Sequence, residues 1–168
     1  VLPTELNILP LRDSVIYPML IAPLNVGRAS GVRLIDDSVA GQDRIIGVVV
    51  QRDPMTDEPG FKDIYTVGCA VIVRTLMKAP DQVRLIVQGI SRFKIVGDVQ
   101  KKPYLRAKIE QIDEPESEAD VSEEVEALRR TVAALFDQAV RLSPIMPDEL
   151  RSLTTAVQEP SVMSDLVA

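Results

Sequence analysis

The chain has 168 residues, of which 46% are hydrophobic and 26% charged, and its formal net charge is −6. It contains no histidine and a single cysteine. This composition excludes catalytic triads and metal sites that need imidazole, internal disulfides and thiolate zinc cages. The acidic balance also argues against a strong binder of nucleic-acid phosphates.

The sequence shows no segment that would span a membrane. Prolines 18 and 23 interrupt the apolar segment 15–24, and no run approaches the ~20 apolar residues that a spanning helix needs. No signal-peptide pattern opens the chain. Together with the single cysteine, these features favour a reducing, intracellular environment.

The first part of the chain carries strand signals and one helix signal. A short apolar run around Ile8 predicts a strand that ends in a turn at Pro10. Residues 17–24 contain two prolines, which predicts an extended connection. Apolar residues then recur at helical spacing, which predicts a helix over residues 28–39.

Further strands are predicted up to residue 113. Residues 44–51 indicate a buried strand, and the β-branched run 64–78 with the alternating run that starts at Val83 indicates a hairpin. Phe93 and its neighbours are expected to continue the meander. Residues 105–110 alternate apolar and charged side chains, which is typical of a half-buried antiparallel strand. Several strands with one inserted helix predict a small closed or half-closed β-barrel.

Helix signals dominate after residue 113. An acidic linker leads through a possible capping box at Ser117 into one long helix, with apolar residues at alternating steps of four and three over residues 121–142. This seam is expected to pack against a neighbouring subunit or the next segment of its own chain. A second helix is expected to open at Pro147, and a third to start at Val162 with Ser161 as its cap. We therefore predict an α+β chain with a barrel lobe, 1–113, and a helical lobe, 114–168, that is cut off as a fragment of a longer protein.

Motifs for catalysis are absent from the sequence. The glycines do not form a dinucleotide fingerprint, and there is no Gly-Lys-Ser/Thr triplet to hold nucleotide phosphates. Cys69 lies among apolar strand residues and is expected to be a small buried residue rather than a nucleophile. No lysine has the small-residue surroundings that would bury it beside a serine. The chain alone is therefore expected to be noncatalytic, with no cofactor and no metal.

An apolar interaction surface is the remaining functional signal. Met19, Leu20 and Ile21 lie between two prolines, and Met55 and Phe61 lie in a loop between two strands. Methionine adapts its shape, so it recurs on surfaces that accept varied partners. These five residues are the candidate polypeptide contacts. The alternative is that some are core residues, Leu20 and Ile21 first among them.

A second hypothesis is RNA binding, because small β-barrels often bind nucleic acid. Lys101, Lys102, Arg106 and Lys108 form a local basic patch, and Tyr104 lies within it. Stacking platforms usually need several aromatic residues, and the net charge opposes phosphate binding. Nucleic acid is therefore an unfavoured partner.

A series of short motifs runs in order along the chain: Ile8-Leu9-Pro10-Leu11-Arg12-Asp13, Tyr17-Pro18, Pro23-Leu24-Asn25-Val26-Gly27-Arg28, Gln51-Arg52-Asp53-Pro54, Asp57-Glu58-Pro59-Gly60, Asp63-Ile64-Tyr65-Thr66-Val67-Gly68, Val83-Arg84-Leu85-Ile86-Val87-Gln88-Gly89, Pro103-Tyr104-Leu105-Arg106-Ala107 and the tail from Glu159-Pro160 to Ala168. In this order they resemble the N-terminal domain of the ATP-dependent Lon protease family, and the resemblance covers essentially the whole chain. One departure is the turn Pro80-Asp81-Gln82, where that family often carries Asp-Gly.

The resemblance implies a PUA-like barrel followed by a helical lobe, and a role in recognition and assembly rather than catalysis. It implies capture of unfolded or degron-bearing polypeptides for a homohexameric serine protease that degrades misfolded and short-lived regulatory proteins. The AAA+ motor with its ATP and Mg, and the Ser–Lys dyad, would lie outside this chain. A bacterial cytoplasm is expected, with an organellar matrix as the alternative. The competing hypothesis is a stand-alone module of the same fold that binds polypeptide or RNA.

Overall fold

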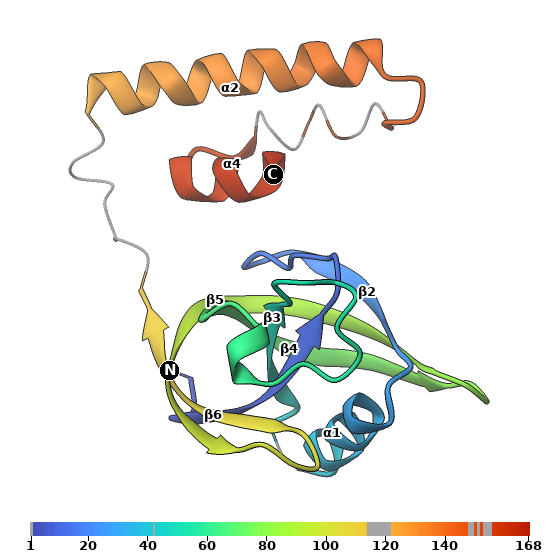
Figure 1. Cartoon of the computed structure of the whole chain (residues 1–168). Helices are drawn as coiled ribbons and strands as arrows, with labels where there is room; N and C mark the ends of the chain where they lie inside the picture. The colour runs from blue at the N-terminus through green and yellow to red at the C-terminus, as the bar shows by residue number, and fades with distance from the viewer. Residues whose placement is uncertain (1, 42, 114–121, 148–149, 151, 153–155) are drawn as a thin grey trace. The chain divides into compact units, whose positions relative to one another are not determined.

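A computed structural model describes residues 2–41, 43–113, 122–147, 150, 152 and 156–168 (Figure 1). The chain divides into two compact units, Val1–Asp113 and Glu114–Ala168. The first unit holds the strands and the second holds the helices that follow them.

The first unit is a β-barrel with an inserted helix. Its sheet has the strand order β2-β5-β4-β3-β1-β6, and an additional β5–β6 pairing closes five of the strands into a ring. β1 and β3 are parallel, and the other pairs are antiparallel. The elements are β1 (Glu5–Leu11), β2 (Ile21–Val26), α1 (Ala29–Ala40), β3 (Ile45–Val50), the 3₁₀ turn η1 (Phe61–Asp63), β4 (Val67–Lys78), β5 (Val83–Gln100) and β6 (Leu105–Ile112). The predicted barrel with one inserted helix is confirmed.

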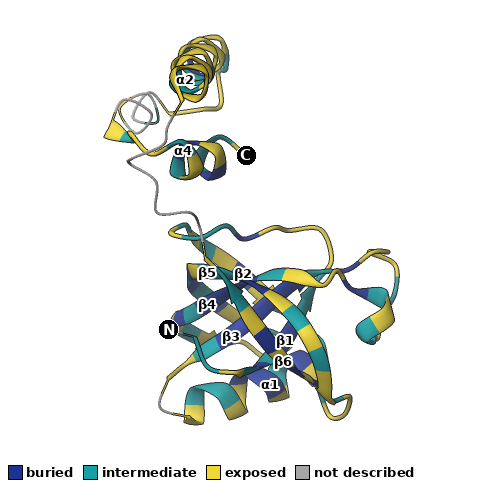
Figure 2. Ribbon diagram, turned by 90° about the vertical axis from the view of Figure 1, so that its left-hand side faces the viewer, coloured by how far each residue is buried: buried dark blue, intermediate teal, exposed yellow. Residues whose placement is uncertain are grey.

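Burial follows the sequence periodicity that predicted the strands and the helix. In β6 the apolar residues Leu105, Ala107 and Ile109 are buried and the charged residues between them are exposed. In α1, Leu34 and Ile35 are buried on the face that packs against β1. Figure 2 shows the buried residues of this unit concentrated along the strands and along one side of α1.

Two apolar clusters stabilise the barrel. One includes Leu34 and Ile35 of α1 with residues of β2, β3, β4 and β5. The other surrounds Phe93, which is fully buried against residues of β1, β3, β4 and β6. Gly47 makes room for this ring, because a Cβ at that position would lie 2.8 Å from the Phe93 ring. Cys69 is buried in the first cluster, as predicted.

Three details of the strand prediction are wrong. The expected meander after Val87 is one continuous strand, β5, which changes partner along its length: its first half pairs with β2 and its second half with β6. The expected connection over residues 17–24 contributes its last four residues to β2. β1 does not stop at Pro10 but runs through it to Leu11.

Both prolines occupy strands because their missing N–H groups are not needed there. The Gly89 N–H donates to the Leu20 carbonyl, so the backbone N–H and C=O groups of the even-numbered residues of β2 point towards β5. The backbone of Pro23 points away from β5, and its missing N–H removes no hydrogen bond between the two strands. In the same way, the Leu11 carbonyl accepts from Gln51 on the β3 side. The backbone of Pro10 therefore faces the side on which β6 has already ended.

The second unit contains α2 (Glu123–Leu142) and α4 (Pro160–Val167). Ser122 caps α2 by accepting a hydrogen bond from the Val125 N–H, and the helix ends at Ser143 as predicted. The predicted cap at Ser117 and the helix predicted from Pro147 lie mostly outside the described residues. The helix expected to start at Val162 with Ser161 as its cap begins two residues earlier, and Pro160 occupies its first turn, where a missing N–H has no cost.

The predicted apolar seam of α2 is not buried in this unit. Leu128, Leu135 and Leu142 on the seam are exposed, whereas Val140 on a neighbouring stripe is buried. Figure 2 likewise shows α2 as mostly exposed or half-buried. Among the described helices, none is long and apolar enough to cross a membrane.

Candidate functional site

A tight turn carries the first three candidate contacts, Met19, Leu20 and Ile21. Met19 adopts a left-handed backbone conformation with φ of 67°. Its N–H donates to the Gly89 carbonyl at 3.1 Å, and the Gly89 N–H donates to the Leu20 carbonyl at 2.8 Å. Met19 and Ile21 are 67% and 66% exposed, and Leu20 between them is half-buried. The core alternative is therefore wrong for Ile21.

Strand pairing extends this exposed point into a surface. Ile21 and Ile72 both pair with Gln88, so the three side chains leave the same face of the sheet. Pro23 pairs with Ile86 on the same face, which also carries the exposed Met77. We call this surface the outer sheet face. It consists of Ile21, Pro23, Ile72, Met77 and Ile86, on β2, β4 and β5.

Met55 and Phe61 belong to a different segment, the loop between β3 and β4. Met55 is 80% exposed. The buried Gln51 side chain fixes the loop by donating to the Asp53 and Thr56 carbonyls at 3.1 and 2.9 Å. Phe61 is half-buried against the cluster around Phe93. The structure therefore brings only part of the predicted set onto one surface.

A cavity of about 780 Å³ opens in the first unit and was not predicted. It lies where β1 and β2 do not pair, and the start of α1, residues 58–60 and residues 101–105 complete its wall. Pro10 and Pro23 both line it. Because these two prolines remove donors from the strand edges, they help to keep the opening unpaired.

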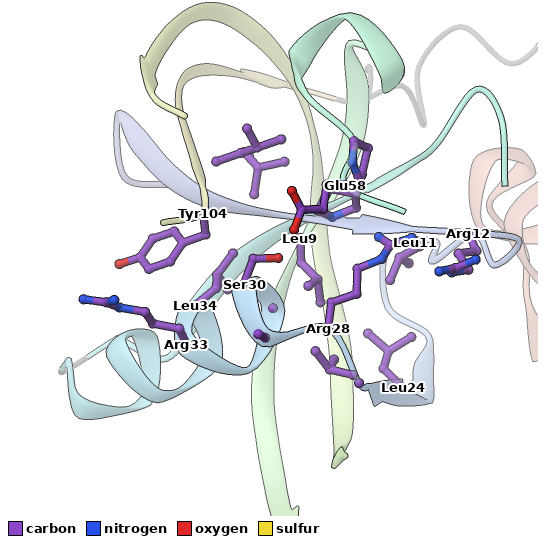
Figure 3. Close-up of a pocket in the computed structure, with 18 of the residues that line it drawn as sticks. Leu9, Leu11, Arg12, Leu24, Arg28, Ser30, Arg33, Leu34, Glu58 and Tyr104 are labelled. Atoms are coloured by element: carbon purple, nitrogen blue, oxygen red, sulfur yellow. The ribbon is translucent and has the colours of Figure 1, made fainter. Parts of the chain in front are cut away.

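The cavity lining is cationic although the chain is acidic. It includes five cationic residues and two acidic ones, Asp13 and Glu58. Figure 3 shows Arg33 and Tyr104 towards one end, Arg12 towards the other, and Arg28 and Glu58 between them. The five cationic residues are Arg12, Arg28, Arg33, Lys101 and Lys102.

Arg28 has the most unusual environment in this lining. Its terminal nitrogen donates to the Thr56 carbonyl at 3.2 Å. Its Nε is buried and has no hydrogen-bond partner in the described structure. Burial lowers the pKa of Arg28, the nearby guanidinium of Arg12 lowers it further, and Asp57 partly offsets both effects. Arg12 itself pairs with Asp57 at 3.1 Å.

Tyr104 supplies both an apolar surface and a polar group at the cavity. Its hydroxyl donates to Asp37 of α1 at 2.9 Å. Burial, followed by this hydrogen bond, raises the pKa of Tyr104. Leu9, Leu24 and Leu34 line the same cavity, which therefore combines apolar and cationic surface.

The remaining predicted features fall elsewhere. The basic patch considered for RNA is divided, because Lys101 and Lys102 line the cavity while Arg106 pairs with Glu5 at 3.2 Å. Among the described residues, no group of three or more cysteine and carboxylate side chains is arranged to hold a metal ion. No sequence signal marked Arg28 as a site residue, because its neighbours in the cavity come from four other segments.

Comparison with protein families gives one match over nearly the whole chain. The model described as "ATP-dependent protease La (LON) substrate-binding domain" matches residues 5–168. The Lon protease of Anaeromyxobacter dehalogenans is 40% identical over 168 residues, which is 99% of this chain and 20% of the relative. The Lon protease of Dictyoglomus thermophilum is 36% identical, over 99% of this chain and 21% of the relative. The chain thus spans about a fifth of the length of these relatives.

Solved structures show the same fold. The N-terminal domain of a Lon protease from the Mycobacterium avium complex matches with a TM-score of 0.75 at 15% identity, over 96% of this chain and 80% of that chain. A Lon N-terminal domain protein from Xanthomonas campestris matches with a TM-score of 0.57 at 19% identity, over 97% and 96% of the two chains. These matches extend over both units of the chain.

Proposed function

Since this chain belongs to the family of the Lon substrate-binding domain, we propose that it holds non-native polypeptides through the outer sheet face and delivers them to a protease joined to it. The identification made from the sequence motifs is confirmed, and the chain is a noncatalytic substrate-binding domain. Its contacts with polypeptide, and the protease activity of the longer protein, are the proposed part.

The exposed apolar side chains of the outer sheet face are the observation that supports this function. Ile21 and Met77 are 66% and 55% exposed, and the strand pairing places both on the face that carries Ile86. Apolar patches rimmed by polar groups mark sites of protein interaction. A non-native polypeptide exposes the apolar side chains that such a surface can cover. The flexible side chain of Met77 helps this surface to accept different sequences.

The wider setting follows from the relatives, which are about five times longer than this chain. We propose that their remaining length supplies an ATP- and Mg-dependent motor and a serine protease, and that six copies assemble. Display of several weak sites in one assembly can raise overall avidity by about 10²–10⁴-fold. The bacterial cytoplasm is the proposed location, supported by the bacterial origin of these relatives. Unfolded or degron-bearing polypeptides are the proposed partners.

A titration of the 168-residue chain with one labelled protein in two states tests the proposal. A destabilised variant that is unfolded under the assay conditions should bind, and its folded parent should not. Fluorescence anisotropy measures both affinities at the same ionic strength. Equal affinity for the two states, or no binding to the unfolded one, would contradict a role in capturing non-native chains.

A further inference from the structure

We propose that the cavity between β1 and β2 binds the carboxylate of an extended polypeptide segment whose neighbouring side chains are apolar. This inference rests on the proposed function and adds a chemical preference to it: substrates with acidic residues beside apolar ones bind more tightly than neutral ones. The site adjoins the outer sheet face, with which it shares Pro23, but its selectivity has a different physical origin.

Charge is the first argument. The lining has an excess of three positive charges in a chain whose net charge is −6. A concave, partly desolvated site with one sign of charge concentrates the opposite sign. An anion is therefore favoured in this cavity although the chain as a whole repels anions.

The second argument is the state of Arg28. A buried guanidinium nitrogen with no acceptor is costly, and the neighbouring Arg12 adds repulsion. Asp57 pairs with Arg12 and not with Arg28. A carboxylate beside Arg28 would supply the missing acceptor and relieve the repulsion in one step. Guanidinium groups bind carboxylates with well-defined geometry.

The third argument concerns which anion fits. The volume, about 780 Å³, lies within the range of ~300–1,000 Å³ typical of ligand sites. A small inorganic anion would leave most of it empty, and the apolar side chains of Leu9, Leu24 and Leu34 would remain without a partner. An acidic side chain or chain terminus flanked by apolar residues would occupy both kinds of surface. The unpaired strand edges leave room for an extended backbone.

Two labelled decapeptides test the inference on the complete chain. One alternates leucine with aspartate and the other leucine with asparagine, and both have amidated C-termini, so only the aspartate peptide carries carboxylates and the two have nearly equal shape. The aspartate peptide should bind about tenfold more tightly, as expected for a partly solvated hydrogen bond to a charged group. Increasing NaCl from 0.05 to 0.5 M should reduce this ratio towards one, because salt screens charges.

Three variants test which residues cause the preference for the aspartate peptide. Arg28→Gln should reduce the tenfold ratio to about one, since it removes the charge and keeps most of the side-chain length. The double variant Lys101→Gln with Lys102→Gln should lower the ratio without disturbing the fold, because both lysines are exposed. Lys94→Gln is the matched control: it removes an equal charge from an exposed position of β5 outside both the cavity and the outer sheet face, and the ratio should stay near ten.

Each result decides between the hypotheses. Equal binding of both peptides by the unmodified chain would overturn the carboxylate site and leave the proposed function intact. Absence of binding by either peptide would overturn both. Loss of the preference in Lys94→Gln and not in Arg28→Gln would place the carboxylate outside the cavity. Inorganic phosphate that binds more tightly than the aspartate peptide would assign the cavity to small anions instead.

Discussion

Substitution of Ile21 by threonine tests whether the outer sheet face contacts polypeptide. Threonine is β-branched and favours strands, so β2 should remain intact. Complete burial of an isoleucine side chain contributes about 1.5–3 kcal/mol. Because Ile21 is 66% exposed, coverage by a bound polypeptide contributes at most about two-thirds of that amount, or about 1–2 kcal/mol. The expected result is a Kd for unfolded protein that rises about 5- to 30-fold.

Val96→Thr is the matched control for this substitution. Val96 is also β-branched, 55% exposed and on β5, but it lies outside the outer sheet face. Fluorescence anisotropy with one labelled unfolded protein should give an unchanged Kd for Val96→Thr and the increased Kd for Ile21→Thr. Thermal unfolding should show that both variants are as stable as the parent. An Ile21→Thr variant that binds as tightly as the parent would refute the assignment of this face.

Three further predictions concern stability. Gly89→Ala should lower the melting temperature by roughly 4–10 °C in a thermal scan, because its Cβ would lie 2.1 Å from the Tyr17 carbonyl oxygen; an unchanged value would contradict the tight turn. Phe93→Ala should lower the free energy of unfolding by about 3–5 kcal/mol in urea titrations followed by circular dichroism. Hydrogen bonds from Arg129, and from the arginine that follows it, lower the pKa of Glu126 to about 2 from a usual value of 4.5. The stabilisation from Glu126 is therefore present above pH 4.5 and lost between about pH 4.5 and 2, and Glu126→Gln should remove this part of the pH dependence of the melting temperature.

Local burial made α1 and β6 predictable from the sequence. Each of these elements buries one face against the core, so the spacing of its apolar residues directly reports the packing. β2 was missed for the opposite reason: Pro23 is unfavourable in a general strand, and only the register with β5 shows that its missing N–H is not needed. That register is a long-range property which no local window contains.

Two stripes of apolar residues run along α2, and the sequence predicted packing along one of them. Leu128 and Leu135 follow one pattern of threes and fours, and Ala133, Phe136 and Val140 follow another. Leu128 and Phe136 lie eight positions apart, which is about 80° around the helix axis. Both stripes satisfy helical spacing. Only the tertiary structure shows that the second is the more buried and the first remains exposed.

The candidate site was predictable only in its apolar part. Exposed Met19, Ile21 and Met55 follow from proline-rich or loop context, where side chains are less fully packed. The cavity is assembled from five segments spread from β1 to β6, and the cationic groups that face each other are far apart in sequence. A lone arginine such as Arg28 has no local sequence signature, because its role depends on which residues lie across the cavity from it.

The two proposed surfaces are expected to respond differently to salt, which makes their contributions separable. Screening weakens attraction between a carboxylate and the cationic cavity, whereas apolar contact on the outer sheet face is maintained or strengthened by salts such as sulfate. A substrate that uses both surfaces should therefore lose, at high salt, only the increment that Arg28→Gln removes at low salt. The remaining affinity should be the part that Ile21→Thr reduces. If the two variants instead lowered affinity equally at every ionic strength, the bound polypeptide would be held by one continuous surface, and the separation of an apolar and an electrostatic site would be wrong.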